Sequence, residues 1–304
     1  MPRIFVILLN YNGEKDTLEC LASLGKITYK NYAIIVVDNG SRNGREFLKR
    51  VNKKFPEVIT IPLAINTGFS GGNNMGIRYA LAHSADYILL LNNDTTVATD
   101  FLTHLINATE LDKRIGIVGA KIYFSGTKKI WYNGGIFSWF GGGKHIDYNK
   151  LDNHPNEESI KKTDYVTGCT LLIKREVIEK IGLLEEAFFL YYEDVDLCLR
   201  ARKAGYRLVV AQGSHVWHKI SQTTKKLGEP CIQYYHFRNA LLLSKRNAPR
   251  LFSIGIYFWS LCIYIKQLFL SMLPSKRANA RAIMRGIQDF YKGNFGIYKE
   301  RGCC

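Results

Sequence analysis

One apolar run with a polar end most constrains the fold of this chain. Residues 87–91 are continuously apolar or aromatic, and Asn92, Asn93 and Asp94 follow at once. A run of this length is typical of a strand buried on both faces, as in a parallel sheet. Ligands of open α/β sheets bind beyond the carboxyl ends of the strands. Asp94 therefore stands where a bound ligand is expected.

Two interpretations of Asp94 fit this position. A single carboxylate on a rigid strand end suits Mg²⁺, which takes one or two protein carboxylates and fills its other positions with water and phosphate oxygens. Alternatively, Asp94 could cap a helix expected over residues 98–109, because aspartate is a preferred N-cap residue. Taken alone, the stretch supports the cap at least as well as the metal.

Strands and helices alternate over the first 95 residues. The strands are expected at 4–9, 32–37, 58–63 and 87–91, with helices about 18–24, 42–54 and 75–83 between them. This order predicts a parallel sheet with right-handed crossovers. Polar residues end the strands and would lie along one edge of the sheet: Asn10, Asn12, Asp38, Gly68 and Asp94. Turn chemistry explains any one of these ends, but their recurrence indicates a pocket.

A second cluster of acids lies between residues 188 and 202. An aromatic run leads to Glu193, Asp194 and Asp196 at the start of a predicted helix. A helix N-terminus favours negative charge, so these acids are expected to be ionised. Asp196 and Arg200 are four residues apart and can pair, which leaves Glu193 and Asp194 free. Capping of a surface helix would explain one acid but not three.

Two histidines follow on the next predicted strand, His215 and His218. Neutral imidazole can bind Mn²⁺ or Mg²⁺ beside a carboxylate and a diphosphate. A lone histidine is more often a packed or surface residue, so neither histidine indicates a metal site by itself.

The end of the chain combines apolar and basic character. Of the net charge of +16, about +9 lies within residues 245–301, which also hold a mostly apolar stretch at 251–273 interrupted by Lys266. That stretch is long enough to span a bilayer. Basic residues on both flanks instead favour a helix or helical hairpin in the interface of an anionic membrane. A buried core helix is the less favoured alternative, and we expect no nucleic-acid partner.

The seven cysteines include no C-x-x-C pair, so neither a disulfide framework nor a zinc site is predicted. A reducing environment is the default for such a chain. We therefore expect a peripheral or monotopic protein on the cytoplasmic face of the cell membrane. The terminal Cys303 and Cys304 could in principle be lipidated.

Seven segments together resemble the family 2 glycosyltransferases, in a rhamnosyltransferase-like branch. They occur in the family's order over about residues 3–245, at 9–12, 36–41, 66–74, 90–94, 168–175, 192–200 and 234–239. The resemblance implies an α/β chain with the A-type glycosyltransferase fold, which is Rossmann-like with a mostly parallel sheet. It implies a glycosyltransferase domain over 1–245, with a nucleotide-binding half (1–110) and an acceptor half (111–245). A helical, membrane-associating tail would occupy 246–304.

The resemblance also implies roles for single residues. Asp38 would bond a pyrimidine ring within a nucleotide site formed by Asn10, Tyr11, Asn12, Asp38, Asn39, Gly68, Asn73, Asn92 and Asn93. Asn92 stands where the family has the first acid of its D-x-D motif, which leaves Asp94 as the main acidic metal ligand. His218 would complete the site for Mg²⁺ or Mn²⁺ and the diphosphate, with His215 as the alternate. Asp194 would be the general base, with Glu193 as its neighbour.

These roles imply inverting transfer of a sugar, with rhamnose as first candidate, from a dTDP- or UDP-linked donor to a lipid-linked or polysaccharide acceptor. A UDP-hexose donor and a catalytically weak transferase-fold adaptor at the membrane remain alternatives, the second because Asn92 replaces an acid. A nicotinamide-dependent oxidoreductase is disfavoured, since G-x-G-x-x-G does not follow the first strand. A nucleotidyltransferase would need a glycine-rich, basic loop there, which residues 10–13 do not provide.

Overall fold

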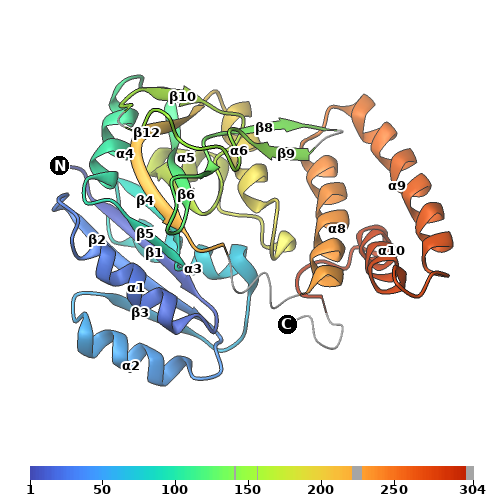
Figure 1. The fold of residues 1–304 in the computed structure, drawn as a ribbon, viewed down its shortest axis with the longest axis horizontal. Coiled ribbons are helices and arrows are strands. Elements are labelled where there is room, and N and C mark those ends of the chain that lie inside the picture. The colour runs from blue at the N-terminus through green and yellow to red at the C-terminus, as the bar shows by residue number, and fades with distance from the viewer. Residues whose placement is uncertain (140–141, 156, 221–227, 299–304) are drawn as a thin grey trace.

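The alternating first half of the chain forms the predicted parallel sheet (Figure 1). The computed structural model describes residues 1–139, 142–155, 157–220 and 228–298. The elements of this half are β1 (Ile4–Asn10), α1 (Glu14–Leu24), β2 (Tyr32–Asn39), α2 (Gly44–Lys54), β3 (Ile59–Leu63), α3 (Gly68–Ala82) and β4 (Tyr87–Asn92). The apolar strands are almost fully buried, as a sheet covered on both faces requires.

Most strands of the second half of the chain extend the same sheet, and two others form a separate two-stranded sheet. The elements of this second half are β5 (Thr95–Val97), α4 (Phe101–Glu110), β6 (Ile115–Phe124), β7 (Ile130–Tyr132), β8 (Gly135–Ser138), β9 (Gly142–His145), β10 (Ile160–Lys162), β11 (Thr170–Lys174), α5 (Arg175–Ile181), η1 (Glu186–Phe188), α6 (Glu193–Lys203) and β12 (Arg207–His218). The strand order is β10-β12-β6-β11-β4-β1-β2-β3. Along this path only β11 and the edge strand β10 are antiparallel to their neighbours. The prediction of a mostly parallel sheet is therefore confirmed.

The sheet register brings the polar strand ends together. Asn10 at the end of β1 is paired with Asp38 on β2, and Leu9 is paired with Asn92 on β4. The carboxyl ends of these three neighbouring strands therefore meet at one edge, as the sequence predicts.

Three predicted elements differ from the structure. The helix expected over 75–83 begins at Gly68, because Gly72 and Gly76 let α3 lie directly on Leu9 and Ile7 of β1, where a Cβ would collide. This close packing outweighs the poor helix propensity of glycine. The short pieces expected at 115–118 and 121–124 form one strand, β6. The helix-cap interpretation of Asp94 is wrong, because β5 separates it from α4, whose N-cap is Asp100.

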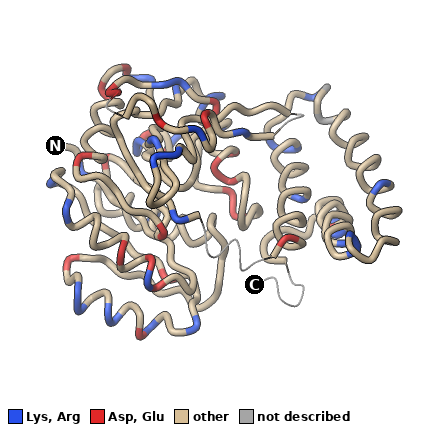
Figure 2. The backbone as a smooth tube through the Cα atoms, in the orientation of Figure 1, with Lys and Arg blue, Asp and Glu red and all other residues tan. Residues whose placement is uncertain are grey.

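The C-terminal helices form a lobe beside the sheet (Figure 1). It contains α8 (Glu229–Asn247), α9 (Arg250–Leu270) and α10 (Arg277–Lys292), with α10 packed against both of the others. Figure 2 shows that basic residues predominate over acidic ones on α9 and α10. Within the described ranges, no helix has the length and apolarity needed to cross a bilayer. The domain boundary at 245 stays a prediction.

The described cysteines differ from the prediction at one position. Cys20, Cys169, Cys198 and Cys262 are free. Cys231 is disulfide-bonded, which the cysteine spacing did not predict. The lipidation considered for Cys303 and Cys304 lies outside the described residues.

Candidate active site

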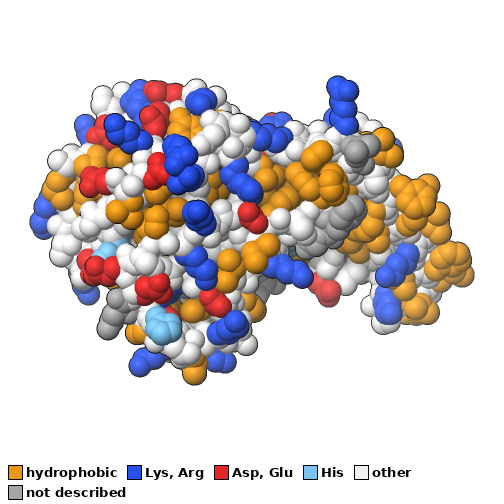
Figure 3. Space-filling view, turned by 90° about the horizontal axis from the view of Figure 1, so that it is seen from above, with side chains coloured by type: hydrophobic (Ala, Val, Ile, Leu, Met, Phe, Trp, Pro, Cys, Tyr) orange, Lys and Arg blue, Asp and Glu red, His pale blue; other side chains and the backbone are white. Residues whose placement is uncertain are grey.

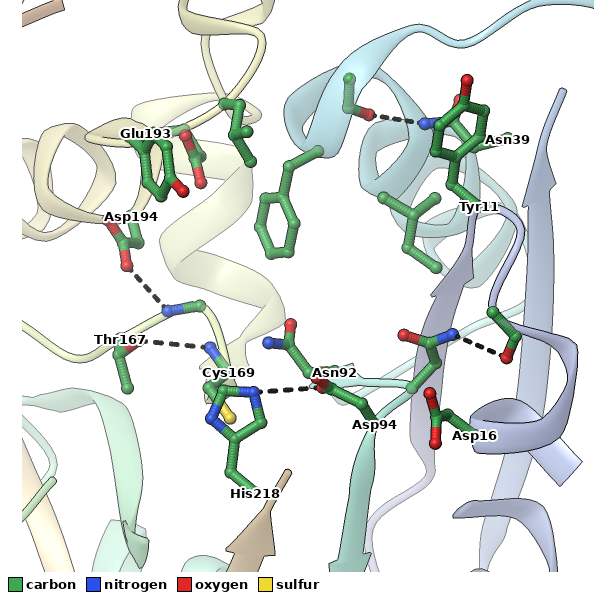
Figure 4. A pocket seen from close by; sticks show the side chains of 18 of the residues that line it. Tyr11, Asp16, Asn39, Asn92, Asp94, Thr167, Cys169, Glu193, Asp194 and His218 are labelled. Atoms are coloured by element: carbon green, nitrogen blue, oxygen red, sulfur yellow. Dashed lines mark hydrogen bonds and ion pairs between the residues drawn. The ribbon is translucent and has the colours of Figure 1, made fainter. Parts of the chain in front are cut away.

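A cavity of about 380 Å³ lies between the ends of β1 and β4 on one side and the start of α6 on the other (Figure 4). Its size is within the range of ligand pockets. Most of the site residues expected from the sequence line it: Tyr11, Asn39, Gly68, Asn92, Asn93, Asp94, Glu193, Asp194 and His218. The two halves of the chain therefore contribute to one site.

The other expected nucleotide-binding residues do not line this cavity. Asn10 is fully buried and donates to Asp38 Oδ1 at 2.7 Å, and Ser41 donates its backbone N–H to Asp38 Oδ2 at 3.2 Å. Asn12 accepts from the backbone N–H of Arg42 at 3.0 Å, and Asn73 donates to a backbone carbonyl of its own helix. The bonds of Asn10 and Asn12 therefore connect the end of β1 and the loop after it with the end of β2 and the residues that follow it, whereas Asn73 bonds only within α3.

Pairing of β5 with β12 brings Asp94 and His218 together. Thr95 lies opposite His218 in this antiparallel pair, and Asp94 Oδ1 is 3.1 Å from His218 Nε2 (Figure 4). Burial lowers the pKa of the His218 imidazole, but the neighbouring Cys169 and Asp94 raise it more, to about 10. Trp131 packs edge-on against the imidazole, with ring centroids 4.7 Å apart. The ring is therefore fixed in place beside the carboxylate.

The donor set at Asp94 and His218 fits a cation that is shared with a substrate and that would displace the proton of the imidazole on binding. Both ring nitrogens of His218 are buried, and neither makes a hydrogen bond of good geometry among the described residues. In that part of the chain, no group of three His, Cys, Asp or Glu side chains could hold a metal by itself. Mg²⁺ and Mn²⁺ suit such a site, since they accept few protein ligands and complete their shells with water and phosphate oxygens.

His215, the alternate metal ligand, is not on the cavity wall. Its Nε2 lies 3.1 Å from the carbonyl oxygen of Gln212, and its ring packs edge-on against Tyr123. Burial lowers the pKa of its imidazole. Residues three apart in a strand point to opposite faces, so only His218 reaches the cavity.

Asp194 faces the cavity from the first turn of α6. Its Oδ2 accepts from the backbone N–H of Gly168 at 2.9 Å, and its Oδ1 accepts from that of Val195 at 2.8 Å. Burial raises the pKa of this carboxyl, and the two hydrogen bonds only partly offset that effect. Each oxygen retains a lone pair for a further hydrogen bond. The carboxylate is thus oriented and more basic than an ordinary aspartate.

Glu193 is buried beside Asp194. Burial, followed by the charge of Asp194, raises the pKa of its carboxyl well above the ordinary value. Its Oε2 has no hydrogen-bond partner in the described part of the chain. The expectation that the helix N-terminus keeps these acids ionised is therefore wrong for Glu193, because desolvation outweighs the helix dipole. Asp196 does pair with Arg200, at 2.8 Å, as predicted.

A strained turn precedes the two acids. Phe189, Tyr191 and Tyr192 have φ of +65°, +70° and +74°. Aromatic side chains rarely adopt this conformation, which costs about 1–3 kcal/mol per residue and persists only where surrounding contacts enforce it. Such strain is typical of functional sites.

Sequence reasoning missed several residues of the wall. Trp131 comes from the short strand β7 and belongs to no motif. Cys169 lies within the segment 168–175, but the pattern of that segment did not predict that its thiol would lie beside His218. Asp16 of α1 also lines the cavity, where it pairs with Lys219 at 2.7 Å. The sequence offered one indication for Asp16. It lies in the first turn of α1, the helix that follows the polar end of β1.

The family model of glycosyl transferase family 2 matches residues 5–182. Among curated relatives, a low-salt glycan biosynthesis hexosyltransferase of Haloferax volcanii is 28% identical over 79% of this chain and 74% of its own length. A dTDP-rhamnosyl transferase of Shigella flexneri is 26% identical, covering 85% of this chain and 86% of the relative. An N-acetylglucosaminyl-diphospho-decaprenol L-rhamnosyltransferase of Mycobacterium tuberculosis is 23% identical, with coverages of 80% and 84%.

Solved structures share the fold. The structure of GalNAc-T7 with UDP, GalNAc and Mn²⁺ aligns with a TM-score of 0.65 and 16% identity over 81% of this chain, which spans 48% of the GalNAc-T7 chain. The mannosyltransferase PcManGT of Pyrobaculum calidifontis, in complex with GDP-Man and Mn²⁺, aligns with a TM-score of 0.58 and 14% identity, covering 96% of this chain and 87% of its own. The predicted A-type glycosyltransferase fold is therefore confirmed, and the chain belongs to glycosyl transferase family 2 and is a glycosyltransferase.

Proposed function

We propose that this enzyme transfers rhamnose, with inversion, from a dTDP- or UDP-linked donor to a lipid-linked saccharide in cell-surface glycan synthesis. The observation that carries the proposal is the single cavity in which the Asp94–His218 pair faces the Asp194 carboxylate (Figure 4). The names of two relatives, which specify rhamnosyl transfer and in one case a decaprenol-linked acceptor, support the choice of sugar and acceptor.

In this mechanism the donor occupies the side of the cavity formed by the strand ends. Tyr11, Asn39, Gly68, Asn92 and Asn93 would contact the nucleotide, while Asn10, Asn12 and Asp38 hold the loops in place. The contact of Asp38 with a pyrimidine ring remains part of the proposal. Asp94 and His218 would hold Mg²⁺ or Mn²⁺. A divalent cation supplies positive charge to the leaving diphosphate when bound.

The acceptor would enter beside the start of α6. Its hydroxyl oxygen attacks C1 of the donor sugar as the bond from C1 to the diphosphate breaks, and Asp194 takes the hydroxyl proton. Phe189, Leu190 and Tyr191 line this side of the cavity and would exclude water around the acceptor sugar. Glu193, buried and with a raised pKa, would remain neutral and so leave Asp194 as the one ionised acid at the base position.

We expect a dTDP-rhamnose donor with Mn²⁺ to raise the melting temperature more than UDP-glucose, UDP-GlcNAc or GDP-mannose does. A ligand that binds only the folded state stabilises by about 2.7 kcal/mol at one hundred times its Kd. A thermal-shift panel, followed by transfer to a polyprenyl-diphosphate saccharide, measures this. If a UDP-hexose gives the strongest stabilisation and is also turned over, the proposed donor changes from dTDP-rhamnose to that UDP-hexose. If nucleotide sugars bind but none is transferred or hydrolysed, the result would favour the alternative of a catalytically weak transferase-fold adaptor at the membrane.

To reach a lipid-linked acceptor, the enzyme would associate with the anionic cytoplasmic face of the membrane through one side of α9. Ile254, Phe258, Leu261, Ile265 and Phe269 recur at helical spacing and are exposed, with Phe258 at 70% and Phe269 at 69%. Exposed Lys266, Lys276, Arg277 and Arg281 lie on α9, on α10 and in the segment joining them. Figure 3 shows hydrophobic and basic side chains side by side at the free end of the lobe. An apolar helix face rimmed by basic residues is typical of a helix in the membrane interface.

Replacing both Phe258 and Phe269 by serine should reduce binding to anionic vesicles at least tenfold. Burying one phenylalanine contributes about 1.5–3 kcal/mol, so two exposed rings supply a large part of the binding energy. Flotation with phosphatidylglycerol vesicles measures the bound fraction. Ile65→Ser is the matched control, because Ile65 is also 70% exposed but lies between β3 and α3. Equal flotation of the double variant and the control would refute the α9 surface.

A further inference from the structure

The strained turn before Glu193 is held by residues of α8, a helix outside the cavity wall. Nδ2 of Asn239 lies 2.9 Å from the carbonyl oxygen of Phe188, 2.8 Å from that of Leu190 and 3.0 Å from that of Tyr191. One amide group thus contacts three carbonyls within four residues. Asn239 is completely buried, so water cannot replace it as a donor.

Arg238, the preceding residue, fixes the orientation of that amide. Its Nε donates to Asn239 Oδ1 at 2.9 Å, so the NH₂ group of Asn239 must face the turn. Its Nη2 donates to the carbonyl of Phe188 at 2.8 Å and to that of Ala187 at 3.2 Å. Arg238 is also completely buried. A guanidinium offers five donors in a rigid fork and suits this role.

Two aromatic stacks from α8 hold the side chains of the same turn. Tyr235 stacks on Phe189 with centroids 5.6 Å apart, and His236 stacks on Tyr191 at 4.6 Å. Four of the five residues from Tyr235 to Asn239 therefore contact the turn, two by stacking on its rings and two by hydrogen bonds to its carbonyls.

The nucleotide-binding half closes on the turn from the other side. The backbone N–H of Phe69 donates to the carbonyl of Phe189 at 2.6 Å. A Cβ on Gly68 would collide with the same carbonyl, and Gly68 itself has φ of +76°. Contacts from both α3 and α8 thus enforce the positive φ angles of Phe189 and Tyr191.

We propose that Asn239 is a positioning residue for sugar transfer, which acts by holding the turn that aims the Asp194 carboxylate across the cavity. The proposal rests on the proposed function in one respect, namely that Asp194 is the general base. Two residues separate Tyr191 from Asp194, so relaxation of the turn displaces the carboxylate directly. A misplacement of about 1 Å at a reacting group can lower a rate by roughly 10²-fold.

Asn239→Ala and Asn239→Asp test this proposal. Asn239→Asp keeps the shape and the bond with Arg238 but loses both N–H donors, so it remains informative if the alanine variant does not fold. Asn74→Ala is the matched control. Asn74 is buried on α3 and makes hydrogen bonds with Leu184 and Glu186, just before the strained turn.

We expect kcat to fall about 10–100-fold in both Asn239 variants, while the Kd for nucleotide with Mn²⁺ stays within about twofold of wild type. Asn74→Ala should keep kcat within about threefold at a comparable loss of melting temperature. If Asn239 only stabilised the fold, its variants and Asn74→Ala would lose the same amount of kcat for each degree by which the melting temperature falls. That result would overturn the proposal.

Hydrogen exchange gives a readout that does not depend on transfer. Exchange of the amides at 188–194 should speed up in the Asn239 variants but not in Asn74→Ala, whose effect should be confined to 183–187. Unchanged exchange at 188–194 would refute the positioning role whatever the activity. Faster exchange there, in a protein whose wild type transfers no sugar, would instead refute only the proposed function.

Discussion

Asp194→Asn should lower kcat for sugar transfer about 10²–10⁴-fold, which is the usual contribution of a general base. The amide keeps the size of the side chain, and its single oxygen can accept one of the two N–H groups, of Gly168 or Val195, that the carboxylate binds. It cannot take a proton. Nucleotide binding should therefore remain near wild type while turnover is lost. Single-turnover transfer and calorimetric titration with the nucleotide measure the two effects separately.

The role of Asp194 as the base also predicts how kcat depends on pH. Burial raises the pKa of the Asp194 carboxyl above its ordinary value of 3.8. The base is active when ionised, so wild-type kcat should be full above this raised pKa and fall as the pH drops through it. The residual activity of Asp194→Asn should lack that acid limb. Asp147→Asn, which removes a carboxylate paired with Lys150 and Lys161 outside the cavity, is the control. An acid limb retained in Asp194→Asn would assign the base elsewhere.

Asp94→Ala should reduce transfer at least 10²-fold and abolish the stabilisation by Mn²⁺ together with nucleotide. Charge stabilisation by a bound cation contributes several kcal/mol, and every 1.36 kcal/mol is a factor of ten in rate. Asn92 offers an amide where a second acid would stand, so no neighbouring carboxylate on this loop replaces Asp94. Transfer rates across a Mn²⁺ titration, with and without chelator, measure the loss.

The fold should survive Asp94→Ala. Burial lowers the pKa of the His218 imidazole, and Cys169 and Asp94 together raise it. Without the carboxylate, His218 can lose its proton and stay neutral, so no unpaired charge remains buried. Circular dichroism and the melting temperature without ligand check this expectation. Wild-type transfer by Asp94→Ala would overturn its role as the metal ligand, whereas an unfolded variant would contradict the expected neutralisation of His218.

The sequence predicted which strand ends meet, because apolar runs and their polar ends are local patterns. It could not predict which polar side chains face the cavity. Asn10 and Asp38 occupy neighbouring positions in the register, and their short side chains bond each other instead of lining the wall. The ring of Trp131 reaches His218 only through pairing of β7 with β6, a contact between distant segments.

The desolvation of Glu193 could not be predicted from the sequence either. The helix dipole acts within one turn and can be inferred from the position of Glu193, but its burial depends on the whole fold. The pairing of β5 with β12 is a further example. Thr95–Val97 is too short to predict as a strand, yet it determines that Asp94 meets His218 and does not cap α4.

The attachment of α8 has a consequence for the reach of the enzyme. The helix that grips the catalytic turn also packs against α9 and α10. If the exposed side of α9 lies at the bilayer surface, as we propose, the lobe would act as a spacer of fixed height between the lipid headgroups and Asp194. An acceptor sugar would then react only if its lipid carrier and the saccharide already built on it spanned that height. Selection for acceptor length would then require no binding site for the remainder of the glycan.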